Sequence, residues 1–177
     1  KNSITNVKDK AVGRGVLLDI ARYKGVPWLE TSYAITDEDL AGCAKAQGVE
    51  VGEGDFILVR TGQLGERQLA GAWGDYAGGP APGLGITAAN YFCPRKVAAV
   101  ATDTWGTEVL PNETPDVFQP LHVIMLVNAG IILGEMWVMD ELAEDCANDG
   151  VYEFLLVAPP LTVTASVGSP VNPQVIK

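Results

Sequence analysis

The sequence contains a single histidine, His122, and this scarcity excludes many common enzyme sites. A serine hydrolase needs a base beside its nucleophile, but no GxSxG motif occurs and the closest stretch, residues 166–170, lies far from His122. The three cysteines are widely spaced and form no CxxC pair, so we predict neither a zinc knuckle nor a disulfide framework. Cys43, Cys93 and Cys146 are expected to be buried free thiols in a reducing cytoplasm.

Basic residues are also few, with 12 Lys and Arg against 22 Asp and Glu and a net charge of -10. This balance argues against nucleic acid or an anionic membrane as partner, because both require clustered Lys and Arg. No apolar run approaches the ~20 residues of a membrane span, and the polar start does not resemble a signal peptide. The chain opens on Lys1 instead of Met, which indicates a fragment or a processed chain.

A length of 177 residues, 47% of them hydrophobic, predicts one globular domain over residues 1–177 that is soluble and cytoplasmic. Continuous apolar runs of strand length recur, as is typical of strands buried on both faces. The predicted strands cover residues 13–19, 56–59, 97–102, 131–133 and 152–157, and the predicted helices cover residues 37–47, 87–92, 122–129 and 140–146. Residues 1–12, 23–33, 63–85 and 107–120 are predicted connectors or loops, and residues 168–173 an extended tail. Strands and helices mix without strict alternation, which favours an α/β domain with a mixed sheet.

The stretch 118–137 carries the residues most indicative of chemistry. His122 begins an apolar helical run that Gly130 ends, and a short apolar strand then leads into Glu135. A carboxylate in such surroundings is costly to bury unless a cation or a donor compensates it. Imidazole and carboxylate together suit Zn²⁺ or Mn²⁺, so we interpret the pair as two metal ligands. The alternatives are a purely structural histidine and a salt bridge from Glu135 to Arg60 or Arg95.

Asp103 and two tryptophans are candidates for a substrate-binding wall. Asp103 follows the predicted strand 97–102, and the carboxyl ends of strands in open α/β sheets tend to face ligand crevices. Capping of a neighbouring turn is the alternative role for Asp103. Trp73 and Trp105 lie in loop segments, where an aromatic side chain contacts either a ligand or the core.

Six stretches, taken in order, resemble the cyclase family of metal-dependent hydrolases, which includes bacterial kynurenine formamidase and isatin hydrolase. They are GVLLDIARYKG (15–25), VGEGDFILVRTG (51–62), AAVATDTWGTE (98–108), PLHVIMLVNAGIILGE (120–135), YEFLLVAPPLTV (152–163) and GSPVNP (168–173). The resemblance implies a swivelling β/β/α-type fold and an oligomeric amidohydrolase. It also implies that a divalent metal activates water to attack a small amide, formamide or cyclic amide, as in tryptophan catabolism.

The metal site of that family has two parts, and only the later part is matched here. The resemblance gives His122 and Glu135 the roles of the later histidine and carboxylate, although Glu135 lies about one residue further along than the family pattern. The first part, an HxGTHxDxxxH motif, does not occur in the 177 residues. The chain therefore resembles the C-terminal part of such an enzyme, completed by a missing N-terminal polypeptide or by a homo-oligomer. The alternative is a non-catalytic binding or assembly module that keeps the fold without a complete metal centre.

Overall fold

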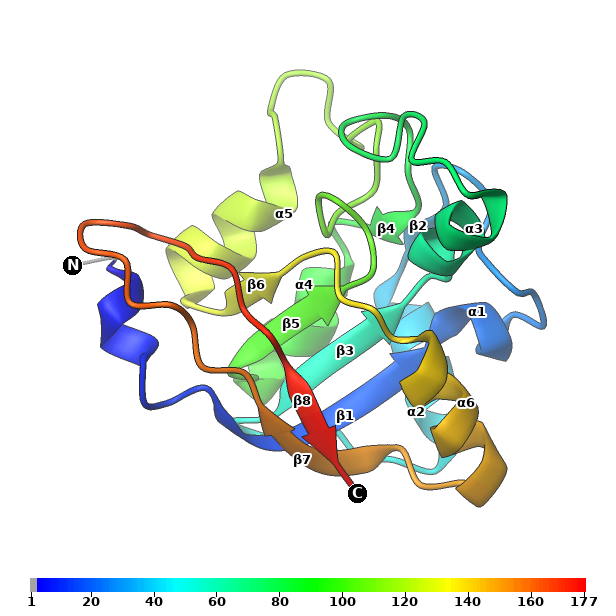
Figure 1. Ribbon diagram of the computed structural model, residues 1–177. Helices are drawn as coiled ribbons and strands as arrows, with labels where there is room; N and C mark the ends of the chain where they lie inside the picture. Colours follow the sequence, from blue (N-terminus) through cyan, green and yellow to red (C-terminus); the bar gives the residue numbers. More distant parts are fainter. Residues whose placement is uncertain (1–2) are drawn as a thin grey trace.

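A six-stranded mixed sheet forms the centre of the molecule in the computed structural model, which describes residues 3–177 (Figure 1). The strands run in the order β6-β5-β3-β1-β7-β8. They are β1 (Val12–Asp19), β3 (Phe56–Arg60), β5 (Ala99–Thr102), β6 (Ile132–Gly134), β7 (Glu153–Val157) and β8 (Gln174–Ile176). The first four are parallel, whereas β7 runs antiparallel to β1 and β8 antiparallel to β7. The predicted α/β fold with a mixed sheet is confirmed.

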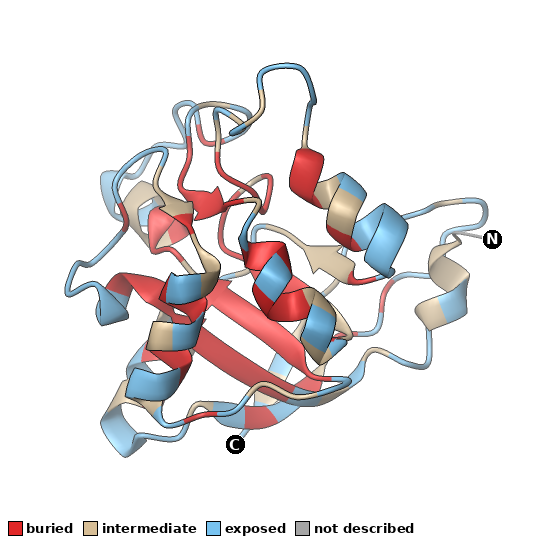
Figure 2. Cartoon of the chain, turned by 180° about the vertical axis from the view of Figure 1, so that it is seen from behind, coloured by how far each residue is buried: buried red, intermediate tan, exposed pale blue. Residues whose placement is uncertain are grey.

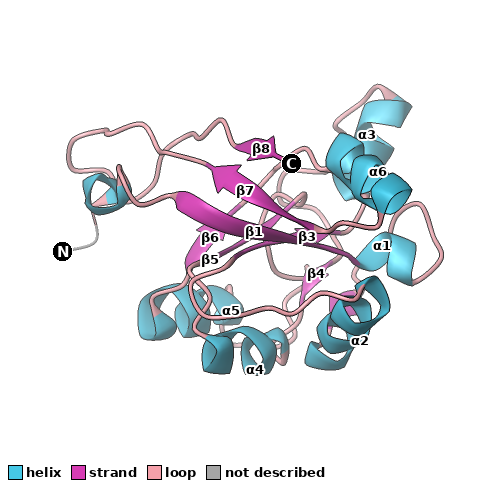
Figure 3. Ribbon diagram, turned by 90° about the horizontal axis from the view of Figure 1, so that it is seen from below, coloured by secondary structure: helices cyan, strands magenta, loops and turns pink. Residues whose placement is uncertain are grey.

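Helices cover both faces of this sheet. They are α1 (Ile20–Tyr23), α2 (Asp37–Gln47), α3 (Gln63–Ala70), α4 (Ala88–Phe92), α5 (Pro120–His122) and α6 (Asp140–Asp149), with the 3-10 helices η1 (Ile4–Val7) and η2 (Cys93–Arg95) and the π-helix η3 (Val123–Ala129). Helices α2, α4 and α5 lie on one face and α6 on the other (Figure 3). A separate two-stranded sheet pairs β2 (Ala34–Ile35) with β4 (Gly83–Leu84). No helix within residues 3–177 is both long and apolar enough to cross a bilayer.

The central strands are buried on both faces, which explains their uninterrupted apolar sequences (Figure 2). Val16 and Leu18 of β1 pack into the core beneath α2, α4 and α5. Leu17, between them, points to the opposite face and packs with Met139 and Cys146, at and within α6. Successive residues of a strand face opposite sides, so one continuous apolar run supplies two cores.

Local sequence signals fix several helix ends as predicted. Thr36 accepts a hydrogen bond from the Asp39 backbone, and the Asp39 side chain accepts one from the Thr36 backbone, which forms a capping box before α2. Gly48 ends that helix in the left-handed region. Pro120 occupies the first position of α5, where its missing N–H costs nothing.

Some predictions about loops were wrong. The predicted loop 63–85 contains α3 and β4, because an eight-residue helix with Gly65 inside and Leu64 as its buried apolar residue gives a weak local signal. Strand β8 lies just beyond the predicted extended tail 168–173, whereas part of the predicted connector 1–12 forms η1 and the start of β1. Residues 1–2 of that connector lie outside the described residues. All three cysteines are free, with Cys43 and Cys146 buried and Cys93 partly exposed.

Gly15 lies in β1 directly opposite Phe154 of β7, and a Cβ at this position would overlap the phenyl ring. We expect Gly15→Ala to destabilise the protein by about 1 to 3 kcal/mol, because the ring is buried and has little room to move. Thermal or urea unfolding measures the change. Gly168→Ala is the matched control, since a Cβ there meets open space. Equal stability of Gly15→Ala and wild type would contradict this packing.

Candidate functional site

Charged side chains line the edge of the sheet at which its parallel strands end. Asp19 and Arg60 are the last residues of β1 and β3, and they are register partners. Asp103 follows the end of β5, and Glu135 follows the end of β6. Because the carboxyl ends of parallel strands meet at one edge, residues far apart in the sequence are gathered into a single row.

His122 and Glu135 meet at the β6 end of this row. The Nε2 atom of His122 lies 3.3 Å from Oε1 of Glu135. The two residues come from adjacent elements, since η3 continues α5 and Gly130 turns the chain back towards β6. Their side chains are 20% and 34% exposed, so the pair is accessible from solvent.

Glu108 completes the cluster, although the sequence had not singled it out as a site residue. Its Oε1 lies 2.7 Å from Nδ1 of His122 and accepts a hydrogen bond from the His122 backbone, while Oε2 accepts one from the Leu121 backbone. Its side chain is only 3% exposed. Glu108 therefore both fixes the imidazole ring and satisfies free N–H groups in the first turn of α5.

The two carboxylates determine the charge of His122. Burial opposes the charged ring, but the hydrogen bonds to Glu108 and Glu135 outweigh it and raise the pKa of His122 to about 9. In the metal-free protein the ring is therefore an imidazolium at neutral pH, and it donates from both nitrogens. A metal at Nε2 would have to displace that proton.

Unusual backbone conformations surround the same cluster. Thr107, Gln119 and Met136 have φ values of 58°, 52° and 60° without being glycine. Thr107 precedes Glu108 and Met136 follows Glu135. Such conformations cost of order 1 to 3 kcal/mol each and persist where the surrounding structure over-determines them, often at functional sites. The Thr107 hydroxyl also lies 3.4 Å from Oε1 of Glu135, within reach to donate to it.

The cluster fits two ligands of a metal ion and not a complete site. Two donors bound to one tetrahedral Zn²⁺ are separated by roughly 3.4 Å, close to the spacing of the His122 and Glu135 atoms. Glu108 approaches the opposite ring nitrogen, which suits an outer carboxylate that orients the histidine and not a third ligand. Within residues 3–177, no group of three or more His, Cys, Asp or Glu side chains is arranged to hold a metal.

Asp103 serves as an internal cap. Its Oδ1 accepts hydrogen bonds from the backbone and the hydroxyl of Thr61, both at 2.8 Å, and its Oδ2 accepts one from the Gly62 backbone at 2.7 Å. The side chain is buried, and burial raises its pKa although these donors oppose the shift. A substrate-binding role for Asp103 stays a prediction, because the hydrogen bonds of its carboxylate among residues 3–177 all come from the turn that begins α3.

The two predicted wall tryptophans lie near one loop that also carries Tyr76. Trp73 is exposed and packs on Tyr76, with ring centroids 5.4 Å apart, and Trp105 approaches Gly78 of the same loop. The buried Tyr76 hydroxyl donates to the Asp103 carbonyl oxygen. Burial and then the carboxylates of Asp103 and Glu135 raise the pKa of Tyr76. Substrate contact by Trp73 and Trp105 stays a prediction.

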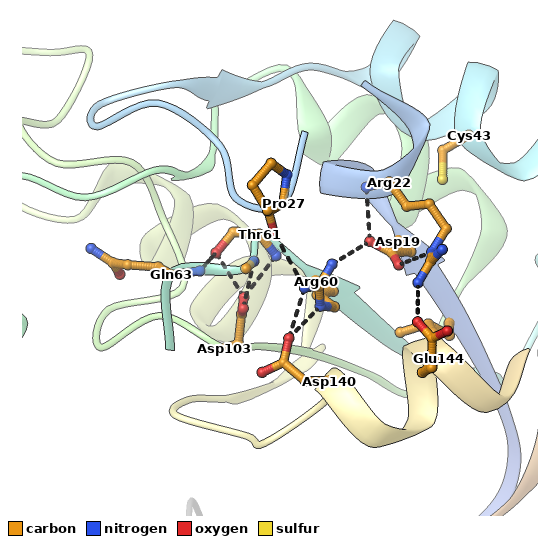
Figure 4. A network of polar contacts seen from close by, with 12 residues as sticks. Asp19, Arg22, Pro27, Cys43, Arg60, Thr61, Gln63, Asp103, Asp140 and Glu144 are labelled. Carbon is orange, nitrogen blue, oxygen red and sulfur yellow. Dashed lines mark hydrogen bonds and ion pairs between the residues drawn. The ribbon is translucent and has the colours of Figure 1, made fainter. Parts of the chain in front are cut away.

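Arg60 is committed to other partners, so the alternative salt bridge from Glu135 is wrong. The Arg60 guanidinium pairs with Asp19 at 2.9 Å and with Asp140 at 2.7 Å, and it also donates to the Pro27 carbonyl oxygen (Figure 4). Arg95 donates to the Tyr91 carbonyl oxygen instead of reaching Glu135.

The sequence did contain a signal for Glu108, because it is a carboxylate directly before the apolar pair Val109-Leu110. Nothing in the sequence indicated that His122 would be its partner.

Comparisons with known proteins place this fold in a family. The Cyclase family model ("Putative cyclase") matches residues 1–109. A solved structure described as a novel cyclase is 38% identical, with a TM-score of 0.86 over 99% of this chain and 56% of that one. No curated protein matches the sequence.

Two more distant structures share the fold. Isatin hydrolase A from Ralstonia solanacearum is 19% identical, with a TM-score of 0.75 over 97% of this chain and 62% of that one. A predicted metal-dependent hydrolase from Bacillus stearothermophilus is 21% identical, with a TM-score of 0.65 over 94% of this chain and 64% of that one. This chain thus spans less than two thirds of the length of each of these three structures. The family match over residues 1–109, together with the 38% identity across nearly the whole chain, shows that the protein belongs to the cyclase family.

Proposed function

We propose that this chain forms part of a metal-dependent hydrolase that acts on a small amide, formamide or cyclic amide, such as an N-formyl aryl amine. The observation that carries the proposal is the 3.3 Å pair of His122 Nε2 and Glu135 Oε1, backed by the buried Glu108 on Nδ1. Similarity to structures described as isatin hydrolase and metal-dependent hydrolase supports it.

His122 and Glu135 would hold a Zn²⁺ or Mn²⁺ ion, which when bound lowers the pKa of water and polarises a carbonyl oxygen. Glu108 would keep the Nδ1 proton in place, so that Nε2 is the nitrogen offered as ligand. Thr107 would steady Glu135 through its hydroxyl. Trp73 and Trp105, which lie in loops near Tyr76, would form apolar walls for the substrate.

The remaining ligands would come from a polypeptide segment outside these 177 residues, in the same longer chain or in an associated subunit. Exposed apolar side chains near His122 offer a surface for that segment. Phe118 is 74% and Val127 73% exposed, and Val123 and Met136 are also exposed. Residues 117–134 carry no Asp, Glu, Lys or Arg, so a segment can pack here without meeting the charge of the acidic chain.

Titration of the chain alone with Zn²⁺ and Mn²⁺ tests the metal pair. Zn²⁺ binding can be followed through the NMR resonance of His122, which is unambiguous in a protein with one histidine, and Mn²⁺ binding through the broadening of that resonance. We expect weak, saturable binding, because two ligands hold an ion poorly. Glu135→Gln should weaken it at least tenfold, whereas Glu38→Gln, an equal change of charge on the exposed side of α2, should leave it unchanged.

The outcomes distinguish an incomplete metal site, a complete metal site and a protein that binds no metal. Tight stoichiometric binding by the chain alone would show that no outside ligands are needed. A His122 resonance that does not respond to either metal would instead favour a non-catalytic binding or assembly module. Hydrolysis of N-formyl aryl amines by the metal-loaded full assembly then tests the substrate class.

A further inference from the structure

A cavity of about 440 Å³ opens at the carboxyl end of β3, and none of the residues of the His122 cluster lines it. Its walls come from the loop after α1, from α3 and from the start of α6. Trp28 and Leu69 contribute exposed apolar surface, and Arg60, Glu66 and Asp140 contribute charge. A volume of this size suits a small organic ligand.

The positive charge in this cavity is already neutralised. Arg60 is 13% exposed and pairs with both Asp19 and Asp140 (Figure 4). Asp19 is itself buried and also pairs with Arg22. Because two carboxylates surround one guanidinium, Arg60 has little remaining attraction for an anionic ligand.

Negative charge exceeds positive charge in the cavity lining, where Glu66 and Asp140 accompany the single cation Arg60. The side chain of Glu66, in the first turn of α3, has no hydrogen bond or ion pair within the described residues. Asp140 uses Oδ1 for Arg60, while its Oδ2 lies against Gly65, where a Cβ would be only 2.6 Å away. Gly65 therefore makes room for a carboxylate oxygen that has no hydrogen-bond partner among residues 3–177. Two carboxylates and the side chain of Trp28 thus border one cavity.

We propose that this cavity binds a small organic cation, a primary ammonium or guanidinium attached to an apolar group. Glu66 and Asp140 would accept hydrogen bonds from the cationic head, and charge-assisted bonds of this kind are about twice as strong as neutral ones. Trp28 would attract the cation through its ring face and cover the apolar group together with Leu69. This site is independent of the metal pair, since β5 lies between β3 and β6 in the sheet.

Benzylamine is a suitable probe, with benzyl alcohol and benzoate as neutral and anionic analogues of similar size. We expect benzylamine to bind measurably and both analogues at least tenfold more weakly. Glu66→Gln and Trp28→Leu should each weaken benzylamine binding at least fivefold in calorimetric titrations. The His122 resonance should not move on binding, which separates this result from that of the metal titration.

Glu38→Gln is again the control, because it removes one negative charge outside the cavity. Unchanged benzylamine affinity in Glu66→Gln, or an equal loss in Glu66→Gln and Glu38→Gln, would overturn the site in favour of general attraction to an acidic surface. Equal binding of benzyl alcohol and benzylamine would also overturn it. Unfolding curves should show that both cavity variants remain folded, since the Glu66 side chain has no hydrogen bond or ion pair among residues 3–177 and Trp28 is partly exposed.

Discussion

Replacement of Asp103 by alanine is expected to destabilise the protein by about 3 to 5 kcal/mol. The carboxylate accepts three hydrogen bonds from Thr61 and Gly62, all of them buried. Each donor left without a partner inside the protein costs roughly 1 to 3 kcal/mol. The same contacts join the end of β5 to the turn that begins α3, so the variant should also loosen that helix. Urea unfolding and amide hydrogen exchange of residues 61–70 measure the two effects.

The conservative variant Asp103→Asn distinguishes capping from general loss of packing. Asparagine keeps one carbonyl oxygen for Thr61 but presents N–H groups to the Gly62 donor, so a loss of roughly half as much stability is expected. Asp75→Asn offers a matched control, because Asp75 is largely exposed and its one ion pair, to Arg67, is at the surface. If Asp103→Ala were as stable as this control, the carboxylate would not be the cap.

The second large effect is expected from Glu108→Gln, which changes the charge state of His122. Without the Glu108 carboxylate the pKa of His122 should fall from about 9 towards its ordinary value of 6.5. The amide also keeps only one acceptor for the Leu121 and His122 backbones, and a loss of about 2 to 4 kcal/mol in stability is expected near neutral pH. An NMR pH titration of the only histidine measures the pKa directly.

The pH dependence of this loss has a definite sign. A raised pKa in the folded state stabilises it fully below the unfolded value of 6.5, and the contribution is lost as pH rises through about 9. The difference in unfolding free energy between wild type and Glu108→Gln should therefore be largest below pH 6.5 and smaller at pH 10. Part of it should remain at pH 10, because the backbone contacts of Glu108 do not depend on the charge of His122. A His122 pKa that stays near 9 in the variant would show that Glu135 alone sets it.

Sequence patterns predicted most helices and strands because the burial of an element determines where apolar residues recur along it. Strands β1 and β3 are continuous apolar runs because both their faces are covered. The ends of α2 were predictable because Thr36 caps its first turn and Gly48 ends it. The pairing of His122 with Glu135 was also predictable. A helix that turns at Gly130 into the adjacent strand brings residues thirteen positions apart together with little freedom.

The tertiary structure alone decided the partners that come from distant segments. Glu108 reaches His122 because the loop after β5 takes a left-handed conformation at Thr107, which no local sequence pattern predicts. Arg60 pairs with Asp19 and Asp140 because strand register and the placement of α6 bring them to one edge. Local patterns in the sequence were therefore enough to predict most strands and helices and the proximity of His122 to Glu135. The contacts between side chains along the sheet edge depend on strand register and on the course of the loops. Both are set by packing over the whole chain, and neither leaves a periodic pattern in the sequence.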